Sequence, residues 1–88
     1  MEYVIMSVRD TKTEVFGRPF CLTSVGQGVR SFTDEVNRRN EDNVMFHHSG
    51  DFSLWQLGTY DDVTGLVTPC TPRLVVQANE VKEAKNVS

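Results

Sequence analysis

The pattern of apolar and polar positions is clearest between Asp51 and Pro69, where it predicts a β-hairpin. Phe52 to Tyr60 is rich in aromatic and bulky apolar side chains, which are typical of strands. The following Asp61-Asp62-Val63-Thr64-Gly65 supplies turn formers and a glycine that tolerates positive φ. We therefore expect two antiparallel strands joined by a tight acidic turn.

Two apolar runs near the N-terminus predict further strands. Tyr3 to Val8 is apolar almost throughout, which fits a central strand that is paired on both edges. Arg9 to Arg18 is polar and ends in a glycine, an arginine and Pro19, so we expect a loop there. Phe20 to Val25 then resumes a short strand.

One helix is expected, from Ser31 to about Arg39. Gly26 and Gly28 break the chain before it, and Ser31 followed three residues later by Asp34 resembles a capping box. Acidic residues in the first turn and arginines in the last turn complement the helix dipole.

The rest of the chain predicts little regular structure. Residues 40–50 have no steady period and are expected to form a loop. Pro69 and Pro72 predict a kinked connection, with a last short strand at residues 74–76. We expect residues 1–78 to form one domain and residues 79–88 to form a flexible tail.

These elements predict an α+β fold, in which a small antiparallel sheet of four or five strands carries one main helix on one face. In a regular strand, Phe52, Leu54 and Tyr60 would project from one face, while Trp55 and Leu57 would project from the other. One helix covers only one face, so the other needs a loop, a second subunit or a ligand. We favour a homodimer or higher homo-oligomer.

Charge and hydropathy narrow the partners. The 88 residues carry a net charge of −3, and the pI is about 5.2. Such a protein is not a general polyanion binder, so any nucleic-acid site has to be a local basic patch. Residues 9–39 hold six of the nine Lys and Arg residues against four Asp and Glu. No stretch is apolar enough to span a bilayer and the N-terminus lacks a signal-peptide pattern, so we expect a cytoplasmic protein with no membrane contact.

The residue types that carry catalysis or bind metals do not form a recognisable motif. His47 and His48 have no third ligand at a suitable spacing, and Asp61-Asp62 lacks the alternation of a calcium loop. Cys21 and Cys70 lie in apolar, strand-like contexts, which predicts buried free thiols. We expect no catalytic residues, no metal and no cofactor.

Two segments resemble a known family. Val15 to Arg38 and His47 to Pro69 are together similar to the small nonstructural protein of gokushoviruses, which are single-stranded DNA phages of the microvirus family. The most specific pieces are Arg30-Ser31-Phe32 leading into Asp34-Glu35-Val36-Asn37, and the spaced residues from Asp51 to Gly65. The resemblance implies a non-enzymatic protein that binds DNA and assists the switch from duplex replication to single-strand genome synthesis and packaging.

The resemblance also suggests which residues contact DNA. Cations would bind phosphates and aromatic rings would stack on unpaired bases. The candidate DNA-binding residues are Arg9, Lys12, Arg18, Arg30, Arg38, Arg39, Trp55 and Tyr60. A competing interpretation makes Trp55 a core or interface residue, and makes the protein an adaptor that recruits a host or phage replication or capsid factor without touching DNA. The low pI favours the adaptor.

Overall fold

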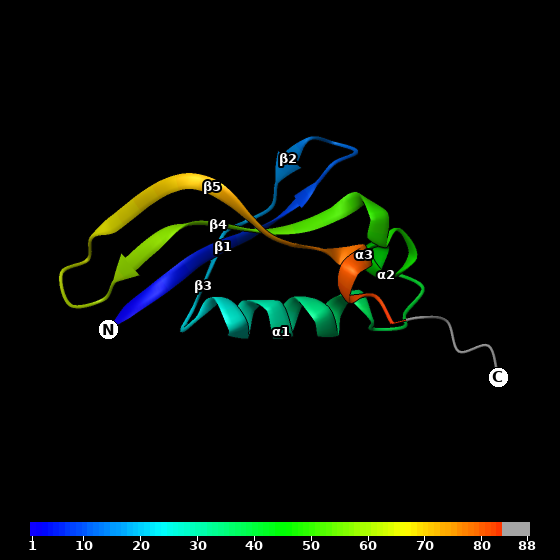
Figure 1. The fold of residues 1–88 in the computed structure, drawn as a ribbon, viewed down its shortest axis with the longest axis horizontal. Coiled ribbons are helices and arrows are strands. Elements are labelled where there is room, and N and C mark those ends of the chain that lie inside the picture. Colours follow the sequence, from blue (N-terminus) through cyan, green and yellow to red (C-terminus); the bar gives the residue numbers. More distant parts are fainter. Residues whose placement is uncertain (84–88) are drawn as a thin grey trace.

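The computed structural model describes residues 1–83, which form one antiparallel sheet with helices on one side (Figure 1). The strands are β1 (Glu2–Asp10), β2 (Val15–Phe16), β3 (Phe20–Leu22), β4 (Phe52–Asp61) and β5 (Val67–Gln77). They follow the order β2-β1-β4-β5, with β3 also paired to β1. The helices are α1 (Val25–Val36), α2 (Val44–His47) and α3 (Ala78–Val81), and η1 (Ser49–Asp51) is a 3-10 turn. The predicted α+β class, the antiparallel sheet and the main helix on one face are confirmed.

The β4–β5 hairpin and the central position of β1 are also confirmed. β1 pairs with β4 along one edge and with β2 and β3 along the other. In the hairpin turn, the Gly65 N–H donates to the Asp61 carbonyl at 2.8 Å, and Gly65 has a φ of 74°. This left-handed conformation favours glycine because it has no Cβ.

The predicted kink at Pro69 and Pro72 is wrong, because both prolines lie inside β5. β5 is the outer strand of the sheet, so a proline there removes no obligatory ladder bond on the solvent side. Instead of a kink between two strands, the pairing of β5 with β4 contains a register shift between Gln56 and Gly58. A Cβ on Gly58 would lie 2.4 Å from the Thr68 carbonyl oxygen, so the close approach of β4 and β5 requires glycine at this position.

The main helix begins at Val25, six residues before Ser31, where the sequence predicted its start. Ser24 caps it, because its Oγ accepts from the Gln27 N–H at 3.1 Å. The Gln27 side chain in turn accepts from the Thr23 N–H at 3.0 Å. The helix ends at Val36, short of the expected Arg39. The two glycines that we expected to break the chain therefore belong to the first turns of α1.

The core lies between α1 and one face of the sheet. Its buried apolar side chains are Met6, Phe32, Val36, Leu54 and Ala78. Gly28 lets the helix approach closely, since a Cβ there would lie 2.3 Å from the sulfur of Met6. The helix is thereby seated on the face of β1 that carries Met6.

Residues 40–50 are not a plain loop, because they contain α2 and the start of η1. The buried Asn43 organises this segment. Its Nδ2 donates to the carbonyl oxygens of Glu35 and Arg38 at 2.7 and 2.8 Å, while its Oδ1 accepts from the Met45 N–H at 3.2 Å. One side chain thus satisfies the end of α1 and the beginning of α2.

Ordered structure also continues past residue 78, where we expected a tail. α3 occupies Ala78–Val81, and Asn37 ties it to α1 by donating from Nδ2 to the Val81 carbonyl at 3.0 Å. The Glu83 N–H donates to Asn37 Oδ1 at 2.8 Å. Residues 79–83 therefore belong to the ordered fold, and the rest of the expected tail, residues 84–88, lies outside the described residues.

Candidate nucleic-acid interface

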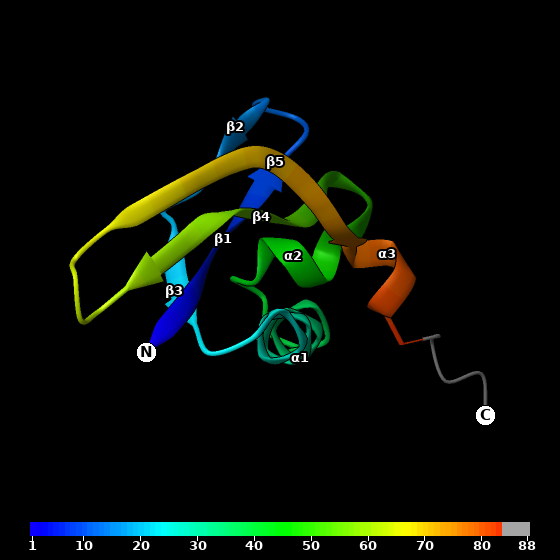
Figure 2. The same cartoon turned by 60° about the vertical axis from the view of Figure 1, so that its left-hand side comes forward.

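The sheet has one face that no helix covers, which we call the open face. Figures 1 and 2 show all three helices on the other side. Residues directly opposite in antiparallel strands share a face, so the pairs Tyr3–Tyr60 and Ser7–Trp55 lie together. Met6 belongs to the opposite face, where it packs in the core. Tyr3, Trp55 and Tyr60 therefore belong to the open face.

A bulge in β4 brings these aromatic residues together. Ile5 pairs with Gly58 while the next residue, Met6, pairs with Gln56, which leaves Leu57 as an extra residue in β4. An extra residue shifts the phase of the side-chain alternation. The prediction that Trp55 and Tyr60 project from opposite faces is therefore wrong, because it assumed a regular strand.

Four aromatic rings form two pairs on the open face. Tyr3 and Tyr60 stack with their centroids 6.4 Å apart. Phe16 and Trp55 meet edge to face, with centroids 5.7 Å apart and an interplanar angle of 84°. The positions of Tyr3 and Ser7 place the two pairs about 14 Å apart along β1, at about 3.4 Å per residue.

Hydrogen bonds of Trp55 and of Gly17, the residue after Phe16, hold the Phe16–Trp55 pair in place. The Trp55 Nε1–H donates to Ser53 Oγ at 2.8 Å. Residues 11–18, which we call the arm, fold back along β1: the Gly17 N–H donates to the Val8 carbonyl, and Ser7 Oγ donates to the Gly17 carbonyl, each at 2.8 Å. The arm therefore holds Phe16 beside Trp55, with 38% of Phe16 still exposed.

The open face is nearly free of charge. Among its paired positions within residues 1–83, Arg9 is the one charged residue, and its guanidinium carbon lies 5.8 Å from the centre of the Phe16 ring. Such a distance is typical of a cation–π contact. Lys12 and Arg18 are exposed on the arm, together with the acidic Glu14. The open face thus combines apolar rings with Arg9, and its arm adds two further cations, of which Lys12 also lines a hollow with Val44 and His48.

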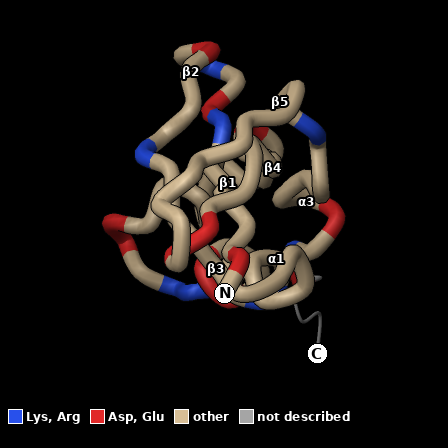
Figure 3. Tube along the Cα trace, turned by 90° about the vertical axis from the view of Figure 1, so that its left-hand side faces the viewer, with Lys and Arg blue, Asp and Glu red and all other residues tan. Residues whose placement is uncertain are grey.

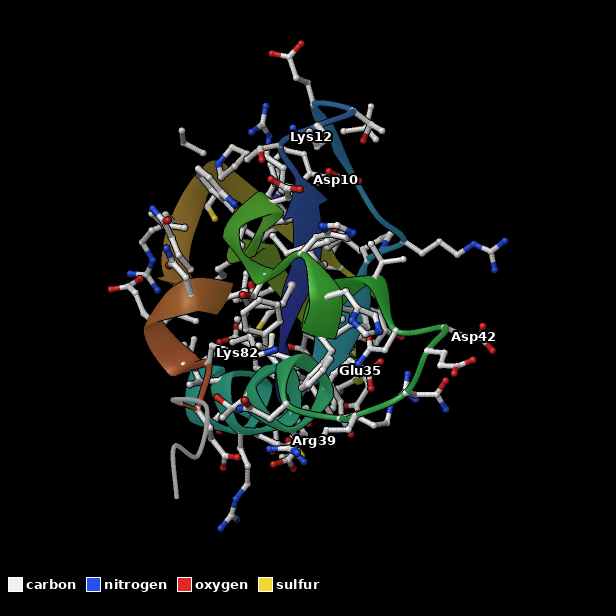
Figure 4. All side chains as sticks on the ribbon, turned by 90° about the vertical axis from the view of Figure 1, so that its right-hand side faces the viewer. Asp10, Lys12, Glu35, Arg39, Asp42 and Lys82 are labelled. Carbon is white, nitrogen blue, oxygen red and sulfur yellow. The ribbon has the colours of Figure 1, made fainter. Side chains whose placement is uncertain are left out.

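The structure separates the eight predicted DNA-binding residues into two groups. Arg9, Lys12, Arg18, Trp55 and Tyr60 belong to the open face and its arm, whereas Arg30, Arg38 and Arg39 lie on α1 or directly after it. Figure 4 shows Lys12 far from α1 and Arg39 close to it. The eight candidate residues therefore do not lie on one surface.

The helix-side arginines have other surroundings. Arg38 forks onto Glu35, with Nε–Oε1 and Nη2–Oε2 distances of 2.9 and 2.7 Å, and this contact lowers the pKa of the Glu35 carboxyl. Arg39 borders a cavity of about 340 Å³ that also contacts Phe46, Lys82 and Glu83. At this cavity, Lys82 Nζ donates to the Phe46 carbonyl, so this cation is already engaged within the protein.

Both thiols are exposed, so the prediction that they are buried is wrong. Cys70 belongs to the outer strand β5 and Cys21 to the short β3, and neither position is covered by another layer. In residues 1–83, no three His, Cys, Asp or Glu side chains gather as metal ligands would. None of the helices in this range has the length and hydropathy that crossing a bilayer requires.

Two residues of the open face were missed from the sequence. Tyr3 was assigned to a strand, but its face could not be known without the register of β1 against β4. Phe16 lies in a segment that we expected to be a polar loop, and only the β1–β2 pairing of Arg9 with Phe16 reveals its place.

Comparison with known proteins identifies the family. A family model described as Phage ORF5 protein matches residues 3–81, which extend from β1 to the end of α3. No curated protein matches the chain, and no solved structure does. The matched range includes every aromatic residue of the open face. The chain therefore belongs to the Phage ORF5 protein family.

Proposed function

We propose that this phage protein is a non-enzymatic, single-stranded DNA-binding protein that acts in the cytoplasm of the bacterial host. The observation that carries the proposal is the open face, where two aromatic pairs and Arg9 share a helix-free sheet surface. The resemblance to gokushovirus nonstructural proteins supplies the biological role: assistance in the switch to single-strand genome synthesis and packaging. Membership in a phage family agrees with that role.

Stacking explains why the strand should be single. Partly exposed rings on a sheet can stack on the faces of unpaired bases, and each stack contributes about 1 to 3 kcal/mol. Bases in a duplex are already stacked on each other and offer only their edges. Trp55 and Phe16 form one stacking site, and Tyr3 and Tyr60 form the other. We therefore expect preference for single-stranded over duplex DNA.

Phosphate contacts come from the three cations of the open face and its arm, Arg9, Lys12 and Arg18. For a single strand, each neutralised phosphate contributes about −0.7 to the slope of log K against log salt. Three contacts predict that affinity falls roughly 20-fold between 50 and 200 mM salt. The net charge of −3 keeps non-specific attraction to other polyanions weak.

Two matched arginine variants test the position of the DNA. Fluorescence anisotropy of a labelled oligonucleotide is measured over a salt series for Arg9→Gln and for Arg30→Gln, which makes the same charge change on α1. We expect Arg9→Gln to weaken binding and to reduce the salt slope by about 0.7, and Arg30→Gln to leave the slope unchanged. Equal effects from both variants would contradict binding at the open face.

A second candidate function, the adaptor, has one specific observation in its favour. At the hairpin turn, Val63 and Leu66 are 81% and 65% exposed, which is unusual for large apolar side chains. If wild-type protein binds no DNA at low salt but retains a purified phage replication or capsid protein, and Val63→Asp loses that partner, the adaptor becomes the better account.

A further inference from the structure

The end of the β4–β5 hairpin carries an exposed apolar cluster. We call the hairpin tip residues 61–66 together with Met1, whose carbonyl accepts from the Asp62 N–H at 3.1 Å. Met1, Val63 and Leu66 are 59%, 81% and 65% exposed. Turns are normally polar, so three large apolar side chains at one end of the molecule indicate a contact surface.

The hairpin tip is both preformed and acidic. The Asp61 N–H donates to the Leu66 carbonyl at 3.0 Å, and the N-terminal ammonium group lies 2.6 Å from Asp62 Oδ1. These contacts fix the turn, so docking it costs little conformational entropy. Figure 3, which faces this end, shows Asp and Glu around the N-terminus. Asp61, Asp62 and Glu2 supply the negative charge.

The open face has the complementary character. Phe16 and Leu74 on this side are 38% and 43% exposed, and Leu74 pairs with Trp55. The charge on the face is Arg9, and the arm adds Lys12 and Arg18 against Glu14. Apolar and aromatic side chains rimmed by cations fit an apolar turn rimmed by carboxylates.

The tip projects away from its own open face. The molecule measures 51 × 26 × 20 Å, and Figure 1 shows the hairpin turn at one end of the long axis. The curved β4–β5 hairpin carries the turn to this end, well away from β2 and the arm (Figure 1). A contact between these two surfaces therefore requires a second copy of the chain.

We infer that the hairpin tip of one copy docks on the open face of a second copy. Val63 and Leu66 contact the Phe16–Trp55 pair, and the carboxylates of the tip lie near Arg9. The two surfaces differ, so the contact is heterologous. In a dimer, one copy keeps a free tip and the other keeps a free face, so further copies can add to form short chains or a closed ring. Association by pairing of β5 edges is disfavoured, because the prolines of β5 lack N–H donors.

In one respect the inference rests on the proposed function. If single-stranded DNA also binds the open face, DNA and the hairpin tip compete for the same surface, with tip carboxylates in the place of phosphates. Self-association would then hold the DNA-binding face covered until a strand displaces the tip. The docking itself requires no DNA, so the two ideas can fail separately.

Complementary variants test the docking. Sedimentation velocity is measured over a range of protein concentrations for wild type, for Leu66→Asp in the tip and for Arg9→Glu on the face. We expect wild type to associate with rising concentration and each variant to stay monomeric. A mixture of the two variants should form 1:1 dimers that grow no further. The intact tip of Arg9→Glu docks on the intact face of Leu66→Asp, and no intact tip or face is left to add another copy. Arg30→Glu on α1 is the matched charge control and should associate like wild type.

Several results would overturn the inference. A wild-type protein that stays monomeric at every concentration would overturn it. Association that is abolished by Leu66→Asp but unaffected by Arg9→Glu would also overturn it, because that pattern indicates a tip-to-tip contact. Phe16→Ser serves as a second face variant, with circular dichroism confirming that each variant is folded.

Dissociation of the wild-type complex by an oligonucleotide supports the shared surface. Dimers of the mixed variants without any DNA binding would retain the docking and refute the proposed function.

Discussion

Gly28 in α1 controls how closely the main helix approaches the sheet, and Gly28→Ala measures that approach. The new Cβ would lie 2.3 Å from Met6 Sδ and 3.0 Å from Leu22 Cδ1. Met6 is fully buried, so its side chain has little space to move away. Overpacking a core costs up to about 3 kcal/mol, and alanine regains about 1 kcal/mol of helix propensity over glycine. We expect a net loss of about 2 kcal/mol.

Gly26→Ala is the matched control in the same helix. Its Cβ would meet only Ser24 Oγ, at 3.9 Å, so the variant should be as stable as wild type or gain up to about 1 kcal/mol. Urea denaturation followed by Trp55 emission gives both free energies of unfolding. A loss of about 2 kcal/mol lowers the Tm of a domain of this size by about 8 to 16 °C. A Gly28→Ala protein as stable as Gly26→Ala would refute the seating of α1 on the Met6 face.

Three further predictions concern the thiols, an ion pair and a helix cap. Cys21 and Cys70 are exposed, so both should react with Ellman's reagent in the native protein; protection of either until urea is added would contradict their placement. Arg38 lowers the pKa of Glu35, so the pair adds stability above the unfolded-state pKa that is lost as pH falls through the folded-state pKa. Arg38→Gln should raise the Glu35 pKa in an NMR titration and should match wild-type stability only in acid. Asn43→Ala removes three buried hydrogen bonds and should cost about 2 kcal/mol in urea unfolding, whereas an unchanged midpoint would refute its capping role.

The hairpin could be predicted because its signals are local. Aromatic and branched residues favour strands, and the acidic turn with Gly65 has few other conformations to adopt. The signal for the start of α1 is also local, because Ser24 and Gln27 have the three-residue spacing that is typical of a helix N-terminus. The sequence prediction gave more weight to the glycines and therefore placed the start at Ser31. Burial against Met6 then offsets the low helix propensity of Gly28.

The composition of the open face could not be predicted, because it depends on one bulge and one pairing. Leu57 carries no mark in the sequence that distinguishes it from a regular strand residue, yet its extra position brings Trp55 and Tyr60 to one face. The exposure of Cys70 likewise follows from the outer position of β5, which is set by strand order and not by alternation. Sequence alone suggested the candidate rings and cations, and tertiary pairing decided which of them lie together.

The most direct test of the open face as the DNA site is the emission of Trp55, the sole tryptophan of the chain. Wild-type protein is titrated with a single-stranded oligonucleotide and with the matching duplex at 50 mM salt, and the titration is repeated at 200 mM. The account predicts saturable quenching by the single strand, little by the duplex, and an affinity roughly 20-fold lower at the higher salt. Binding that raises the anisotropy of labelled DNA while Trp55 emission stays constant would place the DNA elsewhere and contradict the account.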